Sequence, residues 1–175
     1  MTAHEFVPAT MESLDGLHAE LLVLPFFEDE RPLRGAAGLV DWRLCGALSR
    51  KILAGYLVGR SGEKALLVAP APLHTGGLLL LGLGRSEAFE ERSARAACAS
   101  IADTLRGART SSVALALPGR SLERLSALRA MQIWLEIERD LGLLEEISII
   151  EGPEANRDLH SVVDGLRRQA ESPLD

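Results

Sequence analysis

Apolar residues fall along the chain in short continuous runs, which predict a series of buried strands. The run from His18 to Phe27 is apolar almost without alternation, a pattern typical of a strand that is covered on both faces. A shorter strand is expected around Phe6 and Val7. Further strands are predicted at Lys64–Ala69, at Gly77–Leu81, at Ser111–Pro118 and in the segment EEISIIEG, residues 145–152.

Between these runs, apolar residues recur at intervals of three and four, which is the period of a helix with one buried face. The first such stretch, Ala36–Leu53, predicts one helix with Arg50 and Lys51 in its last turn. The other predicted helices start at an N-cap Ser86 and end near Gly107, start at an N-cap Ser121 and end at Gly142, and cover Glu154–Gln169.

The predicted order is strand, helix, two strands, helix, strand, helix, strand and helix. This alternation favours an α/β fold, a three-layer α/β/α sandwich with a mixed sheet. The strands at Lys64–Ala69 and Gly77–Leu81 are joined by a short connection rich in proline and glycine, so we expect them to be antiparallel neighbours. We expect residues 1–175 to form a single domain, with a core at about 19–168 and a frayed tail at 171–175.

Composition and charge narrow the class of protein. Hydrophobic residues make up 47% and charged residues 25% of the chain, which is the balance of a globular protein. A net charge of −6 repels phosphate backbones and argues against a nucleic-acid partner. Because no apolar run reaches the ~20 residues of a membrane span, and the first residues carry neither a basic nor an apolar leader region, we expect a cytoplasmic protein.

Cys45 and Cys98, the two cysteines of the chain, each lie in an apolar helical pattern. We interpret them as small core residues of a reduced protein rather than as disulfide partners. Trp42 and Trp134 stand at helical spacing and are interpreted as packing residues, or as interface anchors where they are exposed.

A glycine-rich turn after the leucine strand raises the question of a phosphate site. The dinucleotide fingerprint needs a third small residue where this chain has Glu87, and the lysine of a P-loop is missing. We therefore interpret Gly82 and Gly84 as a tight turn, with a weak anion site as the alternative. A candidate ligand loop combines these glycines with a polar loop near the same strand; its residues are His74, Thr75, Gly76, Gly82 and Gly84.

The other polar residues form no recognisable catalytic or metal-binding motif. The four histidines are scattered, without a pair at helical or zinc-finger spacing. The carboxylates at Glu28–Glu30 follow a predicted strand end, where α/β folds often bind ligands, but a solvated acidic loop is the simpler interpretation. We assign no catalytic residue, no metal ligand and no cofactor.

Three stretches together resemble the amino-terminal domain of the leucine (cytosol) aminopeptidase family: AELLVLPFFED, LVDWRLCGALSRKILAGYLVGRSGEKALLV and GGLLLLGLGRSEAFEERSARAACASIADTLRGARTSSVALALP. In that family, a segment like G.F.GK.GE precedes a strand that ends in Gly-Leu-Gly-Lys. The matching residues are Gly55, Gly59, Arg60, Gly62 and Glu63 for the first element, and Gly82, Leu83, Gly84 and Arg85 for the second. The resemblance runs from about Ala19 to Ile150 and implies a macro-domain-like fold.

The resemblance also implies a function. Peptidase activity in the family belongs to a separate carboxy-terminal domain, whose metal ligands lie in motifs such as NTDAEGR, and no position of this chain matches that motif. We therefore expect a non-catalytic domain that acts in protein assembly or regulation, through a protein partner or a homo-oligomer. One alternative is a macro-domain-like binder of a nucleotide or an ADP-ribose derivative, with a pocket lined by the loops Pro70–Gly76 and Pro118–Ser121. The others are an aminopeptidase that acts only with a partner subunit, and a domain of a larger aminopeptidase.

Overall fold

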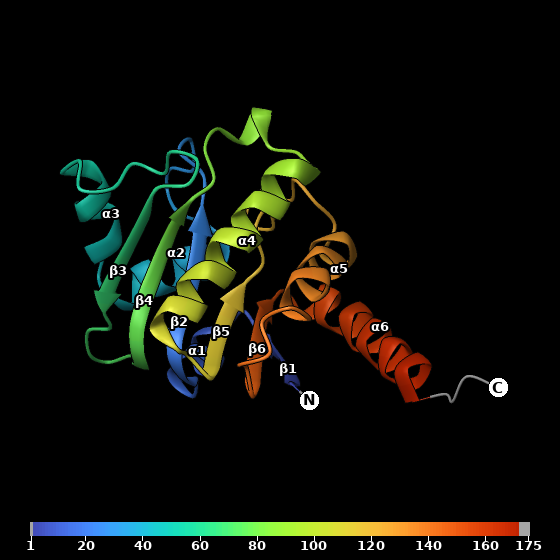
Figure 1. The fold of residues 1–175 in the computed structure, drawn as a ribbon. Helices are drawn as coiled ribbons and strands as arrows, with labels where there is room; N and C mark the ends of the chain where they lie inside the picture. The colour runs from blue at the N-terminus through green and yellow to red at the C-terminus, as the bar shows by residue number, and fades with distance from the viewer. Residues whose placement is uncertain (1, 172–175) are drawn as a thin grey trace.

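The computed structural model describes residues 2–171, with side chains for residues 2–160, 162 and 163, and is built around one six-stranded sheet (Figure 1). The strand order is β1-β6-β5-β2-β4-β3, and every neighbouring pair is parallel except β3 with β4, which is antiparallel. This mixed sheet and its antiparallel pair confirm the sequence-based prediction. The strands are β1 (Ala3–Pro8), β2 (His18–Phe26), β3 (Lys64–Val68), β4 (His74–Gly82), β5 (Ser112–Ala116) and β6 (Glu146–Glu151).

Helices cover both faces of the sheet, which confirms the predicted three-layer α/β/α architecture. Along β2, Leu22 and Leu24 pack toward α1, α2 and α3, whereas Leu21 and Val23 pack toward α4, α5 and α6. Successive side chains of a strand point to opposite faces, so a strand that is buried on both faces is apolar throughout. The helices are α1 (Met11–Asp15), α2 (Gly35–Arg43), α3 (Ala47–Leu53), α4 (Glu91–Ala108), α5 (Ala127–Glu138) and α6 (Pro153–Glu171), and a short 3-10 segment, η1 (Ser86–Ala88), follows β4.

The segment 36–53, which the sequence predicts as one helix, forms α2 and α3 instead. The chain leaves the helical conformation at Cys45 (φ 52°) and Gly46 (φ 79°), both in the left-handed region. The Asp41 carboxylate then accepts hydrogen bonds from two backbone amides in the first turn of α3, which would otherwise lack partners. The break exposes Cys45, so the expected core position is wrong for this cysteine.

The other cysteine and the two tryptophans differ sharply in burial. Cys98 is buried as expected, and burial raises the pKa of its thiol to about 12. Trp134 is fully buried in the core between α5 and the sheet, whereas Trp42 on α2 is 73% exposed. Trp134 is therefore a packing residue, and Trp42 remains the candidate for an interface anchor.

Both predicted N-cap serines and one predicted helix C-terminus are wrong. Glu90, and not Ser86, caps α4 in a reciprocal pair with the third residue of that helix. Ser126 rather than Ser121 caps α5, which ends at Glu138 rather than at Gly142, whereas α4 ends at Ala108, next to the expected Gly107. Serine is a common N-cap residue, but a hydroxyl can equally bond to a distant carboxylate, and both displaced serines do so in this fold.

Of the first and last helices, only the last was expected from the sequence. The short helix α1, which the sequence pattern did not predict, is capped by the Thr10 hydroxyl. The final helix expected at 154–169 is confirmed as α6. Of the tail expected at 171–175, Glu171 belongs to this helix, and residues 172–175 lie outside the described residues. Within residues 2–171, every helix is too short or too polar to cross a membrane.

Candidate functional site at the carboxyl edge of the sheet

The parallel strands of the sheet all end at one edge, which is the upper edge in Figure 1. The connection after β2 leads to α2 on one face of the sheet, and the connection after β5 leads to α5 on the other. In open α/β sheets, ligands commonly bind in the crevice outside the strand ends at such a switch point. We call the region where the loops 27–34, 83–90 and 117–126 meet the carboxyl-edge crevice, after its place in the fold rather than for an open cavity.

The centre of this crevice holds a buried carboxylate, Glu30, which is 1% exposed. One of its oxygens accepts hydrogen bonds from the Phe27 amide at 3.1 Å and from the Ser121 hydroxyl at 2.7 Å, and the other accepts from the Arg34 amide at 2.7 Å. Arg34 is the N-cap residue of α2, so the negative charge lies at the positive end of that helix. An acidic side chain of the chain itself therefore occupies a place that suits an anion.

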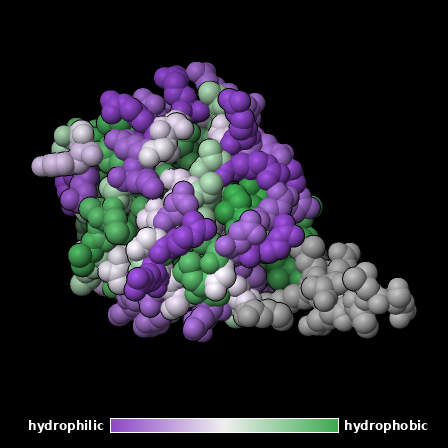
Figure 2. Space-filling view, in the orientation of Figure 1, coloured by the Kyte–Doolittle hydropathy of each residue, from purple (hydrophilic) through white to green (hydrophobic). Residues whose placement is uncertain are grey.

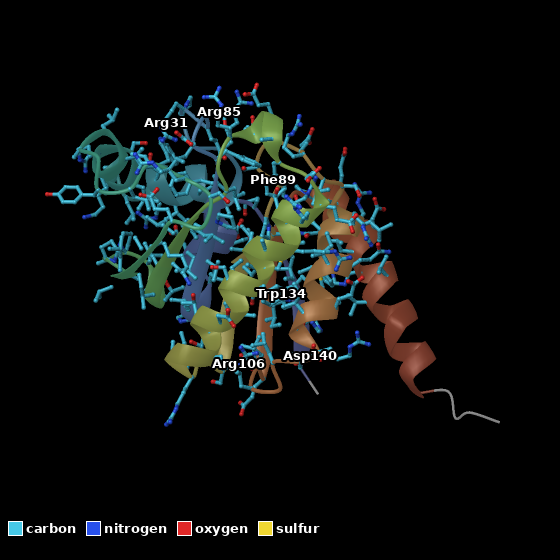
Figure 3. All side chains as sticks on the ribbon, turned by 45° about the horizontal axis from the view of Figure 1, so that its top comes forward. Arg31, Arg85, Phe89, Arg106, Trp134 and Asp140 are labelled. Carbon is cyan, nitrogen blue, oxygen red and sulfur yellow. The ribbon has the colours of Figure 1, made fainter. Side chains whose placement is uncertain are left out.

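Two phenylalanines fill the neighbouring part of the crevice. The rings of Phe27 and Phe89 meet edge to face with centroids 5.0 Å apart, and both side chains are buried. Gly119 lies against the Phe89 ring so closely that an added Cβ would be 2.5 Å from Cε1 of that ring. Figure 3 shows Phe89 at this edge of the molecule, near Arg31 and Arg85. The loops after β2, β4 and β5 are thus packed together rather than held apart.

Polar contacts tie the loop after β2 to its neighbours. The Asp29 carboxylate accepts hydrogen bonds from the Ser86 amide at 2.8 Å and from the Ser86 hydroxyl at 2.6 Å. The hydroxyl hydrogen bond is the main cause that holds the pKa of Asp29 below its ordinary value. The Arg31 guanidinium donates to the carbonyl oxygens of Glu30 at 2.8 Å and of Val58 at 3.0 Å. The loop is therefore fixed by the segments before β3 and after β4.

A second cluster of backbone amides lies before β3, and it too is occupied by a carboxylate. One oxygen of Glu63 accepts hydrogen bonds from the amides of Val58 at 3.0 Å, Gly59 at 2.7 Å and Arg60 at 3.0 Å. Desolvation acts to raise the pKa of Glu63, but the three amides together hold it below its ordinary value. The matching segment of the aminopeptidase resemblance is therefore a turn that is closed by its own glutamate.

The Gly-Leu-Gly turn packs directly on that segment. A Cβ at Gly82 would lie 2.2 Å from the Arg60 carbonyl oxygen, and Gly84 has a positive φ of 77°. The Gly84 amide donates to the Gly59 carbonyl at 2.8 Å, and the Glu28 amide donates to the Gly84 carbonyl at 2.9 Å. Glycine is required here because two backbone segments touch, which supports the interpretation of a tight turn.

The candidate ligand loop of the sequence analysis is not one loop in the structure. His74, Thr75 and Gly76 begin β4, whereas Gly82 ends that strand and Gly84 follows it. At ~3.3 Å per residue, Gly76 and Gly82 are roughly 20 Å apart, so the two groups lie at opposite edges of the sheet. The structure also separates the loops 70–76 and 118–121, which were expected to line one pocket. Ligand binding by either group stays a prediction.

The residues at the start of β4 pack against the start of β2. The His74 ring stacks on the His18 ring with centroids 5.2 Å apart. Thr75 is buried, and its hydroxyl has no hydrogen-bond partner among the described residues. A Cβ at Gly76 would lie 2.8 Å from the Glu20 carbonyl oxygen, so this glycine allows β2 and β4 to approach each other.

Sequence reasoning missed the most important residue of the carboxyl-edge crevice. Glu30 was interpreted as part of a solvated acidic loop, and the structure overturns this because the side chain is buried. A weak signal was present, since Glu30 precedes the first residue of α2 by five residues and its carboxylate can reach a free amide at that helix end. Among residues 2–171, no three His, Cys, Asp or Glu side chains are grouped closely enough to hold a metal ion.

The strand order, the two helical layers and the crevice at the switch point define an α/β/α protein with a macrodomain-like fold. The Trypanosoma brucei macrodomain in complex with ADP-ribose matches 89% of this chain and 66% of its own chain, with a TM-score of 0.69 and 16% identity. The model of the cytosol aminopeptidase family, N-terminal domain, matches residues 23–136. The chain belongs to this family.

Relatives with the aminopeptidase name agree with this assignment. A probable cytosol aminopeptidase of Thermosynechococcus vestitus is 32% identical over 127 residues, which are 71% of this chain and 25% of that protein. The structure of a tomato leucine aminopeptidase mutant covers 89% of this chain and 34% of its own, with a TM-score of 0.60 and 20% identity. The chain therefore spans a minor part of the length of these relatives, and the family match lies in their amino-terminal domain.

Proposed function

We propose that this chain acts as a non-catalytic domain in protein assembly or regulation. The observation that carries the proposal is the exposure of large apolar side chains on β3 and at and just after the end of α3, which lie on opposite faces of the sheet. Leu53, the last residue of α3, is 82% exposed, and Tyr56 in the turn that follows is 81% exposed. Leu66 and Val68 on β3 are 58% and 86% exposed. Figure 2 shows hydrophobic surface on the side of the molecule where Figure 1 has α3 and β3. Apolar surface of this kind is typical of a protein interface.

The packing of the carboxyl-edge crevice supports the same proposal. Glu30 and Phe89 fill the place where an α/β fold would hold a small ligand, while the apolar side chains lie elsewhere. We also propose that residues 1–175 form one domain, because two apolar clusters pack on the two faces of a single sheet. The name of the curated relatives, cytosol aminopeptidase, supports a cytoplasmic location.

Sedimentation velocity of the purified chain tests the proposal. We would measure the chain alone, and in a mixture with the full-length aminopeptidase of Thermosynechococcus vestitus, which stands for a partner of the same family. We expect the chain alone to sediment as a species heavier than one chain, or the chain in the mixture to sediment together with the aminopeptidase. If this chain sediments as a monomer in both samples, and does not co-sediment with the aminopeptidase, an assembly role is contradicted. Hydrolysis of a leucyl amide by the chain alone, with zinc or manganese added, would contradict its non-catalytic character.

The second candidate function is a macro-domain-like binder of a nucleotide or an ADP-ribose derivative. The fold favours it, because the similar Trypanosoma brucei macrodomain is described in complex with ADP-ribose. The local geometry weighs against it: the carboxylates of Glu30 and Glu63 each occupy a cluster of donors that a phosphate would need. An anionic ligand would have to displace them or bind elsewhere. We therefore place this function second.

A further inference from the structure

The outer edge of the sheet at β3 is an unused row of backbone hydrogen-bonding groups. β3 stands at the end of the strand order, and within residues 2–171 it pairs with β4 alone. The Gly82 amide donates to the Glu63 carbonyl and the Ala69 amide donates to the Gly76 carbonyl, which fixes the alternation along this pair. Odd-numbered residues of β3 therefore bond to β4. The even-numbered residues turn their amide and carbonyl groups away from the sheet.

The side chains of these outward residues make the edge attractive to another strand. Lys64, Leu66 and Val68 lie on the α4 side of the sheet, where the Lys64 ammonium donates to the Thr104 hydroxyl at 3.2 Å. Leu66 and Val68 are largely exposed. Natural proteins usually protect an edge strand with central charges, bulges or a covering element. Here Lys64 is the one charged residue of the strand, and it stands at the end.

We propose that β3 pairs antiparallel with β3 of a second copy of this chain, around a two-fold axis at Leu66. This inference rests on the proposed assembly function and names its partner and surface. In this register Leu66 faces Leu66 of the second copy, and Lys64 faces Val68. Each of these facing pairs exchanges two backbone hydrogen bonds, so the interface gains about six. The two sheets become one continuous sheet.

The side chains of β3 suit pairing with a second copy of the same strand. The two lysines of the dimer lie at opposite ends of the shared ladder, each against a valine, so no like charges face each other. On the other face Ala65 meets Leu67 of the second copy. The two-fold axis is perpendicular to the sheet, which brings the two α3 helices to the same face.

Cysteine cross-linking tests the register directly. The experiments use a Cys45→Ser background, because Cys45 is exposed, while Cys98 is buried and keeps its proton. Residues that face each other as a hydrogen-bonded pair have Cα atoms about 5.5 Å apart, within the disulfide range of about 4.4–6.8 Å. We expect Leu66→Cys to form a covalent dimer on mild oxidation. Lys64→Cys and Val68→Cys should cross-link in a mixture, and neither should do so alone.

A matched pair of substitutions tests whether the same contact holds the dimer in solution. Leu66→Lys places two like charges opposite each other at the axis and should weaken dimerisation about tenfold or more in sedimentation equilibrium. Leu128→Lys makes the same change on α5, at an exposed leucine outside the edge, and should leave the dimer intact. Both positions are exposed, so circular dichroism should show both variants folded.

Different outcomes of these experiments distinguish the β3 pairing from the broader assembly role. A dimer that survives Leu66→Lys, or that gives no Leu66→Cys cross-link, overturns the β3 pairing and leaves assembly through another surface. A chain that is monomeric alone but binds the full-length aminopeptidase overturns the second copy as the partner and leaves the assembly role standing. A chain that stays monomeric in both conditions overturns both.

Discussion

Single carboxylates organise the loops of this protein by collecting backbone amides. Glu30 joins the start of α2 to the loop after β5, and Glu63 closes the turn before β3. Each accepts three hydrogen bonds from groups that would otherwise lack partners. Leaving a buried donor unpaired costs more than an ordinary hydrogen bond contributes. We therefore expect substitutions at these two residues to act on stability.

The first prediction concerns the buried carboxylate of the crevice. Glu30→Gln keeps the size of the side chain but turns an acceptor oxygen into a donor that faces backbone amides. We expect the free energy of unfolding to fall by about 1–3 kcal/mol, which lowers Tm by several degrees in a domain of this length. Glu28→Gln is the control, because the described structure gives the Glu28 side chain no hydrogen bond, and its effect should stay within about 0.5 kcal/mol. Equal Tm values for the two variants would contradict the role of Glu30.

The second prediction concerns the pH dependence that Glu63 confers. Its folded-state pKa lies below the ordinary value of 4.5, so its contribution to stability is complete above that pH and is lost as the pH falls through the folded-state pKa. Urea unfolding of the wild type and Glu63→Gln should show the largest difference near neutral pH and a shrinking difference below pH 4.5. A difference that grows toward acid pH would have the wrong sign.

At the scale of elements, helix ends depend on contacts that lie outside the helix. α2 ends before two residues with left-handed backbone conformation, Cys45 and Gly46. α3 begins where the Asp41 carboxylate accepts a hydrogen bond from a backbone amide of its first turn. α4 passes through Gly107 without a break and ends one residue later, at Ala108. Local glycine signals thus give opposite results at two positions: Gly46 has a positive φ of 79°, whereas Gly107 is helical.

The third prediction uses these two glycines as a matched pair. Gly107→Ala should stabilise the protein by about 0.5–1 kcal/mol, because alanine favours the helix and the added Cβ meets no atom within 4 Å. Gly46→Ala should destabilise it by about 1 kcal/mol or more, because a side chain strains the positive φ. Thermal and urea unfolding measure both changes. Effects of the same sign would show that the helix boundaries are misplaced.

At the scale of the whole molecule, a macrodomain-like fold carries a filled crevice and an exposed edge. The loops after β2, β4 and β5 close over Glu30 and Phe89 at one edge of the sheet, while β3 leaves backbone groups and apolar side chains uncovered at its side. The fold alone suits a nucleotide ligand or a protein partner equally, so the local packing has to decide between these functions.

The fourth prediction tests that decision with ADP-ribose. A ligand at a hundred times its dissociation constant stabilises a protein by about 2.7 kcal/mol, which raises Tm by several degrees at this size. We expect no change in the Tm of this chain, because its own carboxylates hold the donors of the crevice. The Trypanosoma brucei macrodomain, measured under the same conditions, should show a clear increase and serves as the positive control. An equal increase in this chain would favour the ligand-binding function instead.

The sequence by itself determined the architecture of this protein. The continuous apolar run of β2, the helical stripes and the short connection between β3 and β4 are local patterns. They were sufficient for the three layers, the antiparallel pair and the order of the elements, apart from α1 and the break between α2 and α3. Their information is local, because the period and length of a segment decide which faces it must bury.

Only the tertiary structure decided which loops meet. Glu30 and Ser121 are 91 residues apart in the chain, and their hydrogen bond exists because β2 and β5 are neighbours in the sheet. The same strand order placed the two halves of the expected ligand loop, at His74 and Gly82, at opposite ends of β4. Strand order is a property of the packed sheet and leaves no periodic signal in the sequence. The filled crevice could therefore be seen only once the chain was folded.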